Sequence, residues 1–175
     1  MKKVILSFIG LSLMVGCKDD KPDPIITPDP GAQNVWVLNE GNFQGGNCAL
    51  GVYDLDSEVY SDKVFQTINN RQLGDVLQSA TAIDGEVFLV VNNSGKIEVV
   101  NEETFESTGT ISGLTSPRFI LPISASEALV SDLFSDSLAV IDPATKKVTD
   151  YINISSSSEE MVKVGNKVFI TNTTN

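Results

Sequence analysis

The sequence predicts an all-β protein, and more closely a β-propeller built from four-stranded antiparallel blades of about 40 residues each. From Asn34 onward the chain consists of short β-rich runs broken by turn residues, with hardly any helical periodicity. The polar residue that ends an apolar run recurs at Asn92, Asp132 and Asn172, at a spacing of 40 residues. A repeat of this length is typical of propeller blades.

A second set of apolar runs repeats at nearly the same interval. Residues 99–101 (Val-Val-Asn) and 140–142 (Val-Ile-Asp) lie 41 residues apart. An earlier copy begins at residues 35–39 and continues, after a longer connection over residues 40–47, with Val52-Tyr53-Asp54. The same order of strands is therefore predicted in each repeat.

Turn residues separate these runs where a sheet would need them. Asp84-Gly85 and Gly165-Asn166 each stand between two apolar runs, which predicts two-residue hairpin turns. Asp142-Pro143-Ala144-Thr145 has the composition of a type I turn, and residues 101–104 occupy the same place one repeat earlier. Each repeat is thus expected to be a four-stranded antiparallel sheet.

We expect blades at residues 34–68, 79–111, 118–152 and 161–175. The first lacks its innermost strand and the last lacks its two outer strands, so the chain is expected to form about 3.5 blades of an incomplete ring. A seven-bladed parent is expected. Two alternatives stay open: short chains that close a ring by association, and a plain β-sandwich, against which the 40-residue register argues.

Residues 1–16 have the features of a secretory signal peptide. Lys2 and Lys3 precede a short apolar run, and Gly16 is a small residue suited to a cleavage site. The apolar run is too short for a stable membrane-spanning helix. Because a cysteine follows directly, the segment resembles a bacterial lipoprotein signal in which Cys17 takes the lipid. An ordinary signal followed by an incidental cysteine is the alternative.

Residues 17–33 are predicted to be a tether. Pro22, Pro24, Pro28 and Pro30 interrupt both helix and sheet, so this run is expected to act as a semi-rigid spacer. The acidic pair Asp19-Asp20 resembles the export signal that sends Bacteroidetes lipoproteins to the outer face of the outer membrane; a merely solvated linker is the alternative. We expect a lipid-anchored outer-membrane protein that faces the exterior and touches the membrane through its lipid only.

Composition excludes several classes of function. The formal net charge of −11 disfavours nucleic acid and anionic lipid as partners. The chain has no histidine, which excludes His-based metal sites and histidine general bases within it. Cys48 is the only cysteine besides Cys17, so we expect no disulfide and a small buried side chain at Cys48.

Several of these segments resemble a known family. Val52-Tyr53-Asp54 and residues 140–145 and 168–172 are similar to the YncE-like, YVTN-type propellers. Residues 38–43, 74–79, 116–119 and 159–162 resemble the surface propeller lipoproteins of Bacteroidetes, a group that includes the cobalamin-binding propeller that caps a TonB-dependent vitamin B12 transporter. The resemblance covers residues 34–175. It implies a ligand-binding face, seven blades and no catalysis. We also expect no resident cofactor or metal.

Strand order predicts where a ligand would bind. In a blade, the loop between the second and third strands and the crossover to the next blade emerge on one face. Amides and carboxylates with a few aromatic residues on that face suit a neutral or cationic small ligand. The predicted ligand-binding residues are Asn39, Glu40, Asn42, Phe43, Asp75, Gln78, Asn92, Asn93, Arg118, Asp132, Phe134, Glu160 and Asn172.

Structural roles are open alternatives for these residues. Asn and Asp at strand ends are frequent turn formers. Arg118 could clamp an anionic group of a ligand, or it could pair with Asp75 or Glu160 as a structural bridge. Phe134 could pack between blades, and Trp36 is expected to be a core residue.

Two classes of function stay open, and the leading one is capture of a small ligand, such as a corrinoid, for a TonB-dependent transporter. The alternative is an adhesive or scaffold propeller that binds protein or glycan. An enzyme is less favoured, because propeller enzymes rely on histidines, metal clusters or paired acids, and this chain has no histidine.

Overall fold

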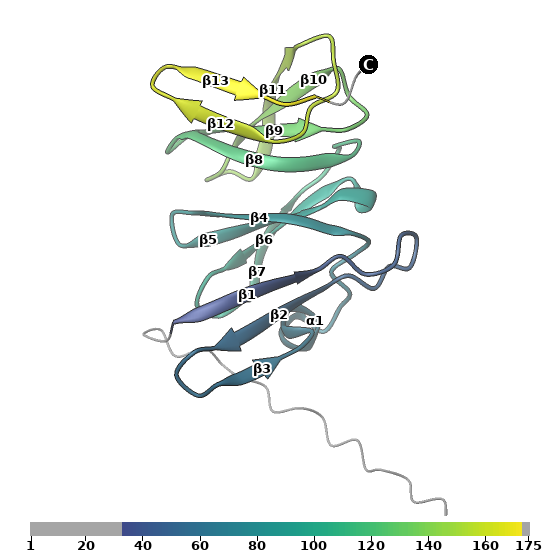
Figure 1. The fold of residues 1–175 in the computed structure, drawn as a ribbon, viewed down its shortest axis with the longest axis vertical. Coiled ribbons are helices and arrows are strands. Elements are labelled where there is room, and N and C mark those ends of the chain that lie inside the picture. Colours follow the sequence, from purple (N-terminus) through teal and green to yellow (C-terminus); the bar gives the residue numbers. More distant parts are fainter. Residues whose placement is uncertain (1–32, 173–175) are drawn as a thin grey trace, which may run out of the picture.

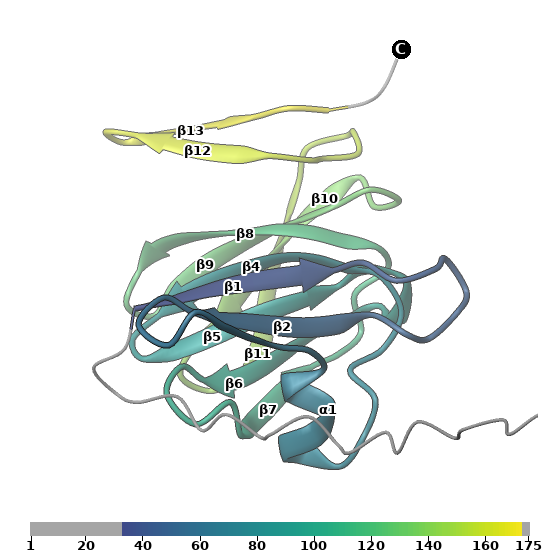
Figure 2. The same ribbon diagram turned by 60° about the horizontal axis from the view of Figure 1, so that its bottom comes forward.

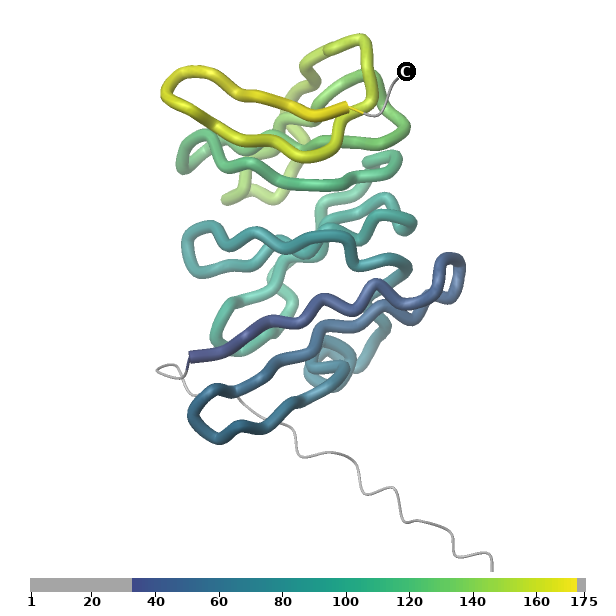
Figure 3. The backbone as a smooth tube through the Cα atoms, viewed as in Figure 1, coloured from purple at the N-terminus to yellow at the C-terminus, as the bar shows by residue number. Residues whose placement is uncertain are grey.

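The fold is a row of antiparallel sheets packed face to face, as the ribbon and the backbone tube show (Figures 1 and 3). The structure is a computed structural model that describes residues 33–172. The predicted signal peptide 1–16, the lipidation site Cys17 and nearly all of the tether lie outside the described residues, as do residues 173–175. No helix among residues 33–172 has the length and apolar character needed to cross a membrane.

The first sheet has three strands in the order β1-β2-β3. The strands are β1 (Asn34–Asn39), β2 (Ala49–Asp54) and the short β3 (Val59–Ser61). A short helix follows, α1 (Val64–Asn69), which lies beside β2 (Figure 2).

Two four-stranded sheets and a hairpin complete the row. The second sheet comprises β4 (Leu77–Ile83), β5 (Glu86–Val91), β6 (Lys96–Asn101) and β7 (Ser107–Ile111), with the 3₁₀ turn η1 (Asn92–Ser94) between β5 and β6. The third sheet comprises β8 (Pro117–Ser124), β9 (Glu127–Asp132), β10 (Ser137–Asp142) and β11 (Lys147–Asn153). The last is the hairpin of β12 (Met161–Val164) and β13 (Lys167–Ile170).

This arrangement confirms the predicted fold class, an unclosed propeller of about 3.5 blades. One element departs from the prediction, because residues 64–69 form α1 where only strands were expected. The helix is too short to show periodicity in the sequence, and its first two residues, Val64 and Phe65, are equally typical of a strand. In the structure both are buried: Val64 is 5% exposed and Phe65 is 0% exposed.

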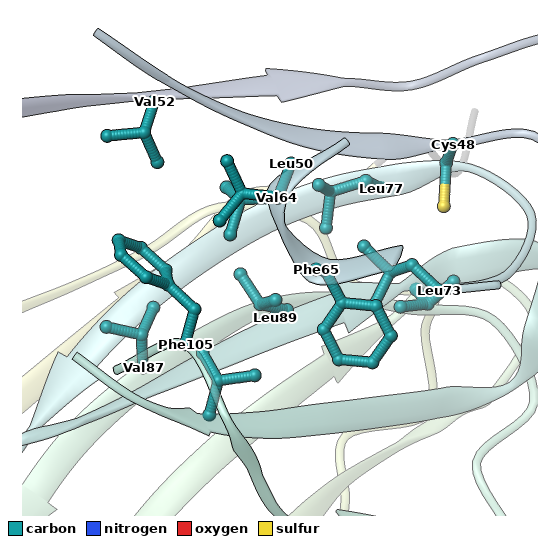
Figure 4. Packing of buried hydrophobic residues seen from close by; sticks show 12 residues of the cluster. Cys48, Leu50, Val52, Val64, Phe65, Leu73, Leu77, Val87, Leu89 and Phe105 are labelled. Carbon is teal, nitrogen blue, oxygen red and sulfur yellow. The ribbon is translucent and has the colours of Figure 1, made fainter. Parts of the chain in front are cut away.

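Each pair of neighbouring sheets encloses its own hydrophobic core. Between the first and second sheets the core takes in α1 and the side chains of β2, β4 and β5 (Figure 4). Val87, Leu89 and Val91 of β5 point into this layer, whereas Phe88 and Val90 point into the layer shared with the third sheet. A third layer lies between the third sheet and the β12–β13 hairpin. The strict alternation of β5 buries both faces of its sheet, which is what a central blade requires.

Trp36 and Cys48 belong to the first of these layers, as predicted. Trp36 is half-buried against Phe105, with ring centroids 4.7 Å apart. Cys48 is fully buried. Burial, with the nearby Asp75 carboxylate adding to it, raises the pKa of Cys48 to about 11, so the thiol is protonated and unreactive at neutral pH.

The turns that lead into the last strand of the first three sheets repeat the same hydrogen-bond pattern. Asn101 Oδ1 accepts from the backbone N–H groups of Glu103 and Thr104, both at 2.9 Å. Equivalent pairs of bonds to the carboxylates of Asp54 and Asp142 close the other two turns. The predicted role of Asp142 in a turn is therefore confirmed, and the backbone supplies the donors each time.

Candidate functional site

The predicted ligand-binding residues gather along one edge of the row, which we call the loop edge (Figure 1, right-hand side). It consists of the β1–β2 loop (residues 40–48), the α1–β4 connection (70–76), η1, the β9–β10 loop (133–136) and the crossovers over 112–116 and 154–160. Strands β1, β5, β9 and β13 all end there. The opposite edge carries the hairpin and Asx turns.

The β1–β2 loop is the longest of the loops at this edge, and its own polar groups hold its shape. The N–H of Asn42 donates to Asn47 Oδ1 at 2.8 Å, and the N–H of Gly45 donates to the Asn42 carbonyl at 2.7 Å. Gly41 has φ +76°, and a Cβ there would lie 2.6 Å from Asn47 Oδ1. Phe43 stands out from this folded loop and is 70% exposed.

Asp75 ties three segments of the loop edge together. Its Oδ2 accepts from the backbone N–H of Gln44 at 2.8 Å and from Asn93 Nδ2 at 2.5 Å. Its own backbone N–H donates to Ser94 Oγ at 3.0 Å. The residue is only 9% exposed, and its second carboxylate oxygen, Oδ1, is buried without a hydrogen-bond partner.

Asn92 and Asp132 fasten each sheet to the next. Asn92 Nδ2 donates to Ser116 Oγ and to the Pro117 carbonyl, both at 2.9 Å, where the chain enters β8. The N–H of Asp132 donates to Ser158 Oγ at 3.0 Å, where the chain approaches β12. Both residues are buried. Their polar groups are engaged in contacts between sheets, the structural alternative considered for strand-end residues.

Asp132 also orders the crossover into its own sheet. One carboxylate oxygen accepts from the N–H groups of Thr115 and Ser116, at 3.1 and 2.8 Å. The other accepts from the N–H of Phe134 at 2.9 Å. Phe134 itself is 76% exposed, so it does not pack between blades.

Arg118 forms a structural bridge, but with a different partner from those considered. Its Nε donates to Glu159 Oε2 at 2.7 Å, and its Nη1 donates to Gln78 Oε1. The pairing of Arg118 with Asp75 or Glu160 that the sequence suggested is therefore wrong. The side chain of Arg118 is only 21% exposed, and it joins the inner strands β4 and β8 to the start of β12. Arg118 and Gln78 are thereby held together.

The remaining predicted residues lie at strand ends on the loop edge. Asn39 Nδ2 donates to Tyr60 Oη at 3.3 Å. The backbone of Glu160 pairs with Thr171 while its side chain is exposed. Glu40 and Asn172 are also exposed. The structure thus brings the predicted residues to one edge, where the exposed ones are Glu40, Asn42, Phe43, Asn93, Phe134, Glu160 and Asn172.

A buried ionic cluster was not predicted from the sequence. Glu98, in the middle of β6, has a fully buried side chain. Arg71 binds both of its oxygens, at 2.5 and 3.2 Å, and Lys96 Nζ lies 3.0 Å from Oε2. Ser107 Oγ donates at 2.6 Å, and Thr110 Oγ1 lies at 3.3 Å. The only sequence signal was an acidic residue in the middle of an apolar run.

The cluster stabilises the fold rather than offering a reactive group. Burial opposes ionisation and is the largest single influence on Glu98, but the hydrogen bonds from Arg71, Ser107 and Lys96 together outweigh it, so the pKa of Glu98 lies below its ordinary value. Arg71 also lies over the Phe65 ring, 4.8 Å from its centroid. The α1–β4 connection is thus held to the second sheet.

Two other features bear on chemistry. No group of three or more acidic or cysteine side chains within residues 33–172 is arranged to hold a metal ion. A pocket of about 210 Å³ lies on the edge opposite the loop edge, between the turns of the second and third sheets; it is lined by Ile83, Asp84, Glu86, Phe88, Ala125, Pro143 and Ala144. It is shallow and small for a drug-sized ligand.

Comparisons with known proteins agree with this geometry at the level of the fold. The chain belongs to the family described as "Domain of unknown function (DUF5074)", which matches residues 33–175. No curated protein matches the sequence.

Solved propeller structures resemble the chain at low sequence identity. Hydrazine synthase of Kuenenia stuttgartiensis is 14% identical, with a TM-score of 0.54 over 73% of this chain and 36% of that one. The dihydro-heme d1 dehydrogenase NirN is 14% identical, with a TM-score of 0.55 over 78% of this chain and 30% of that one. The WD40 β-propeller domain of Doa1 has the same identity and TM-score over 78% of this chain and 47% of that one. The chain thus spans less than half the length of each of these structures, and the similarity is to their propeller fold.

Proposed function

We propose that this member of the DUF5074 family captures a small ligand at the loop edge, without catalysing a reaction. The observation that carries the proposal is the exposure of two aromatic side chains, Phe43 at 70% and Phe134 at 76%, on separate loops of that edge. Exposed phenylalanine rings are costly in water and are useful where they cover an apolar ligand. The hydrogen bonds within the β1–β2 loop and at Asp132 hold both loops before a ligand arrives.

A corrinoid is the ligand class that we favour. Its flat macrocycle would rest against aromatic side chains, and its peripheral amides would pair with the amide groups of Asn42 and Asn93, both of which are exposed. The resemblance of residues 38–43 and 74–79 to the surface propeller lipoproteins supports the same choice, because these segments form the β1–β2 loop and the Asp75 segment.

The proposed setting is the outer face of the outer membrane. It rests on the signal-like residues 1–16, the cysteine at 17 and the acidic pair Asp19-Asp20. A propeller held on a proline-rich tether would deliver its ligand to a TonB-dependent transporter in the same membrane. We propose a seven-bladed ring, of which this chain supplies about half; the uncovered apolar side chains at the β12–β13 end of the row would then pack against the next blade.

Absence of catalysis is part of the proposal. The negative charge of Glu98 is balanced by the cations Arg71 and Lys96. The described residues show no metal-binding group of acids or cysteines. Neighbours of similar fold include enzymes, but at 14% identity they share the fold with this chain and no site can be transferred from them.

Titration with cyanocobalamin tests the proposal. The whole chain is titrated while the fluorescence of Trp36, its single tryptophan, is followed together with the heat of binding. Binding in the micromolar range or tighter is expected, weakened by Phe43→Ala and by Phe134→Ala. Tyr151→Ala is the matched control, because Tyr151 is also aromatic and 55% exposed but lies on β11, the outermost strand of its sheet, and not on one of the loops that form the loop edge.

Three results would count against the proposal. No binding at micromolar concentration rejects the corrinoid. Equal loss in the Tyr151 variant rejects the loop edge as its site. Binding of glycans or of a protein receptor through Phe43, in place of small ligands, supports the adhesive alternative.

Metabolic labelling with a radioactive fatty acid, compared between the natural chain and Cys17→Ser, tests the lipid anchor separately.

A further inference from the structure

We propose that the buried oxygen Oδ1 of Asp75 is the acceptor for a protonated amine of the ligand, so that this edge selects ligands that carry an ammonium group. The inference rests on the proposed function, since it names the chemistry that the loop edge recognises. It starts from Asp75 Oδ1, a buried oxygen at this edge that has no hydrogen-bond partner among the described residues.

The carboxylate of Asp75 is unusually placed for an acidic residue. It is 9% exposed, and its Oδ1 has no hydrogen-bond partner. Only one other buried side-chain oxygen in the described part of the chain, Gln66 Oε1, shares this condition, and that oxygen carries no charge. Buried polar atoms almost always have a partner, and leaving one without a partner costs free energy.

The charge of Asp75 is also unpaired. The ion pairs formed within residues 33–172 engage Glu86, Glu98 and Glu159, and none engages Asp75. Lys96, a nearby cation, is committed to Glu98 at 3.0 Å. The neutral donors Gln44 N–H and Asn93 Nδ2 serve only Oδ2. A cationic donor at Oδ1 would complete both the hydrogen bonding and the charge.

Residues next to Asp75 suit a cation as well. Gln44, which donates to Asp75, directly follows Phe43, whose ring is exposed. An aromatic face attracts an ammonium group, and the attraction adds to that of a carboxylate. Two adjacent residues of the β1–β2 loop therefore supply a contact to the carboxylate, from Gln44, and an exposed aromatic side chain, from Phe43.

Access to Oδ1 depends on Asn93. This side chain is exposed and donates to the neighbouring oxygen, so its rotation would uncover the carboxylate without moving a strand. The backbone around Asp75 is by contrast held tightly. Gly74 has φ +144°, and a Cβ there would lie 2.7 Å from Ser94 Oγ. The backbone of the acceptor is thus held in place, and entry of a ligand would require the hydrogen bond from Asn93 to Oδ2 to open.

The test uses n-butylammonium as the probe, n-butanol as its neutral counterpart and butyrate as its anionic one. Backbone amide shifts of the whole ¹⁵N-labelled chain are followed during titration. Saturable shifts at Gln44, Asp75 and Asn93 are expected with butylammonium, and none with butanol or butyrate. Asp75→Asn is expected to weaken the binding of butylammonium by at least about tenfold, which corresponds to about 1.4 kcal/mol.

The matched control is Asp84→Asn, which makes the same change of charge in a hairpin turn on the opposite edge. Asp84 is exposed with φ +47°, a conformation that Asn tolerates well, so binding should be unchanged. If Asp75→Asn does not fold, Phe43→Leu at an exposed position takes its place, with an expected weakening of about threefold.

Specific outcomes would overturn the inference. It fails if butanol shifts the same amides as strongly as butylammonium, if Asp75→Asn and Asp84→Asn behave alike, or if no probe binds, in which case a buried water satisfies Oδ1. Corrinoid binding that depends on Phe43 but is accompanied by no ammonium binding would reject this inference and leave the proposed function standing. Ammonium binding without corrinoid binding would support this inference and reject the corrinoid as the ligand.

Discussion

Replacing Arg71 offers a direct test of what holds the first two sheets together. Arg71→Met removes the guanidinium group that binds both oxygens of Glu98, at 2.5 and 3.2 Å, and that lies over the Phe65 ring, and replaces it with an unbranched apolar side chain. The carboxylate of Glu98 stays buried and loses its bidentate partner. We therefore expect the folded state to be destabilised.

The expected cost follows from the contacts that remain. Breaking a buried ion pair by removing one partner costs about 3–5 kcal/mol when the other charge is left alone. Here Lys96 at 3.0 Å and Ser107 at 2.6 Å still serve Glu98, and the side chain of Arg71 is 42% exposed, so water screens part of its effect. We expect a loss of about 2 kcal/mol in the free energy of unfolding, since hydrogen bonds to charged groups contribute about 1.5–3 kcal/mol.

The effect should depend on pH in a defined direction. The pKa of Glu98 is lowered in the folded chain, so its ionised form contributes stability that is fully present above the unfolded value, about 4.3, and is lost as the pH falls through the folded value. The difference between the natural chain and Arg71→Met should therefore be full at pH 7 and shrink in acid below about pH 4.

Urea unfolding followed by Trp36 fluorescence measures the effect, since Trp36 packs in the same core layer. With a typical slope of about 2 kcal/mol/M, the midpoint should fall by about 1 M at pH 7. Lys167→Met on the exposed β13 is the control and should stay within about 0.5 kcal/mol of the natural chain. A midpoint shift no larger than that of the control, or one of equal size at pH 7 and in acid, would refute the role assigned to Arg71.

Three further predictions concern other parts of the molecule. Asp132→Ala removes the acceptor of three backbone N–H groups at a buried position and should cost about 2–4 kcal/mol by urea unfolding, with Asp136→Ala on the exposed loop as a nearly neutral comparison. Phe105→Ala empties a fully buried site beside Trp36 and should cost about 3–5 kcal/mol, seen also as a shift in Trp36 emission. In a Cys17→Ser chain, the thiol of Cys48 should resist an aromatic disulfide reagent at pH 8 and react fully in urea, because burial raises its pKa to about 11; rapid labelling of the native chain would contradict its buried position.

The repeat made most of the fold predictable from the sequence. The polar residues at 92 and 132 mark strand ends at which one sheet is fastened to the next, and Asn172 follows β13 at the corresponding place. The Asx turns at 54, 101 and 142 repeat because an acidic or amide side chain can satisfy two backbone N–H groups there. Such local roles leave a clear mark in a single sequence.

Contacts between distant residues were not predictable in the same way. Glu98 looked like an interruption of an apolar strand, because its partner Arg71 lies 27 residues away on a connection with no regular pattern. A structural bridge was one of two interpretations left open for Arg118, and strand order alone did not distinguish Glu159 from its neighbour Glu160 as the partner. The choice depends on which way the chain enters β12. Helix α1 was missed for a related reason, since burial of Val64 and Phe65 in the core between the first two sheets stabilises it more than its own six-residue sequence does.

The loop edge shows how repeated and unrepeated features differ in meaning. Asn92 and Asp132 recur with the period of the blades, and both are engaged in fastening one sheet to the next. A residue needed in every blade for this purpose is not free to recognise a ligand. The features that break the period are the long β1–β2 loop with its exposed Phe43, the exposed Phe134, and the unpaired oxygen of Asp75. None of them is required to close a sheet or to join two sheets, and for that reason we propose binding as their role.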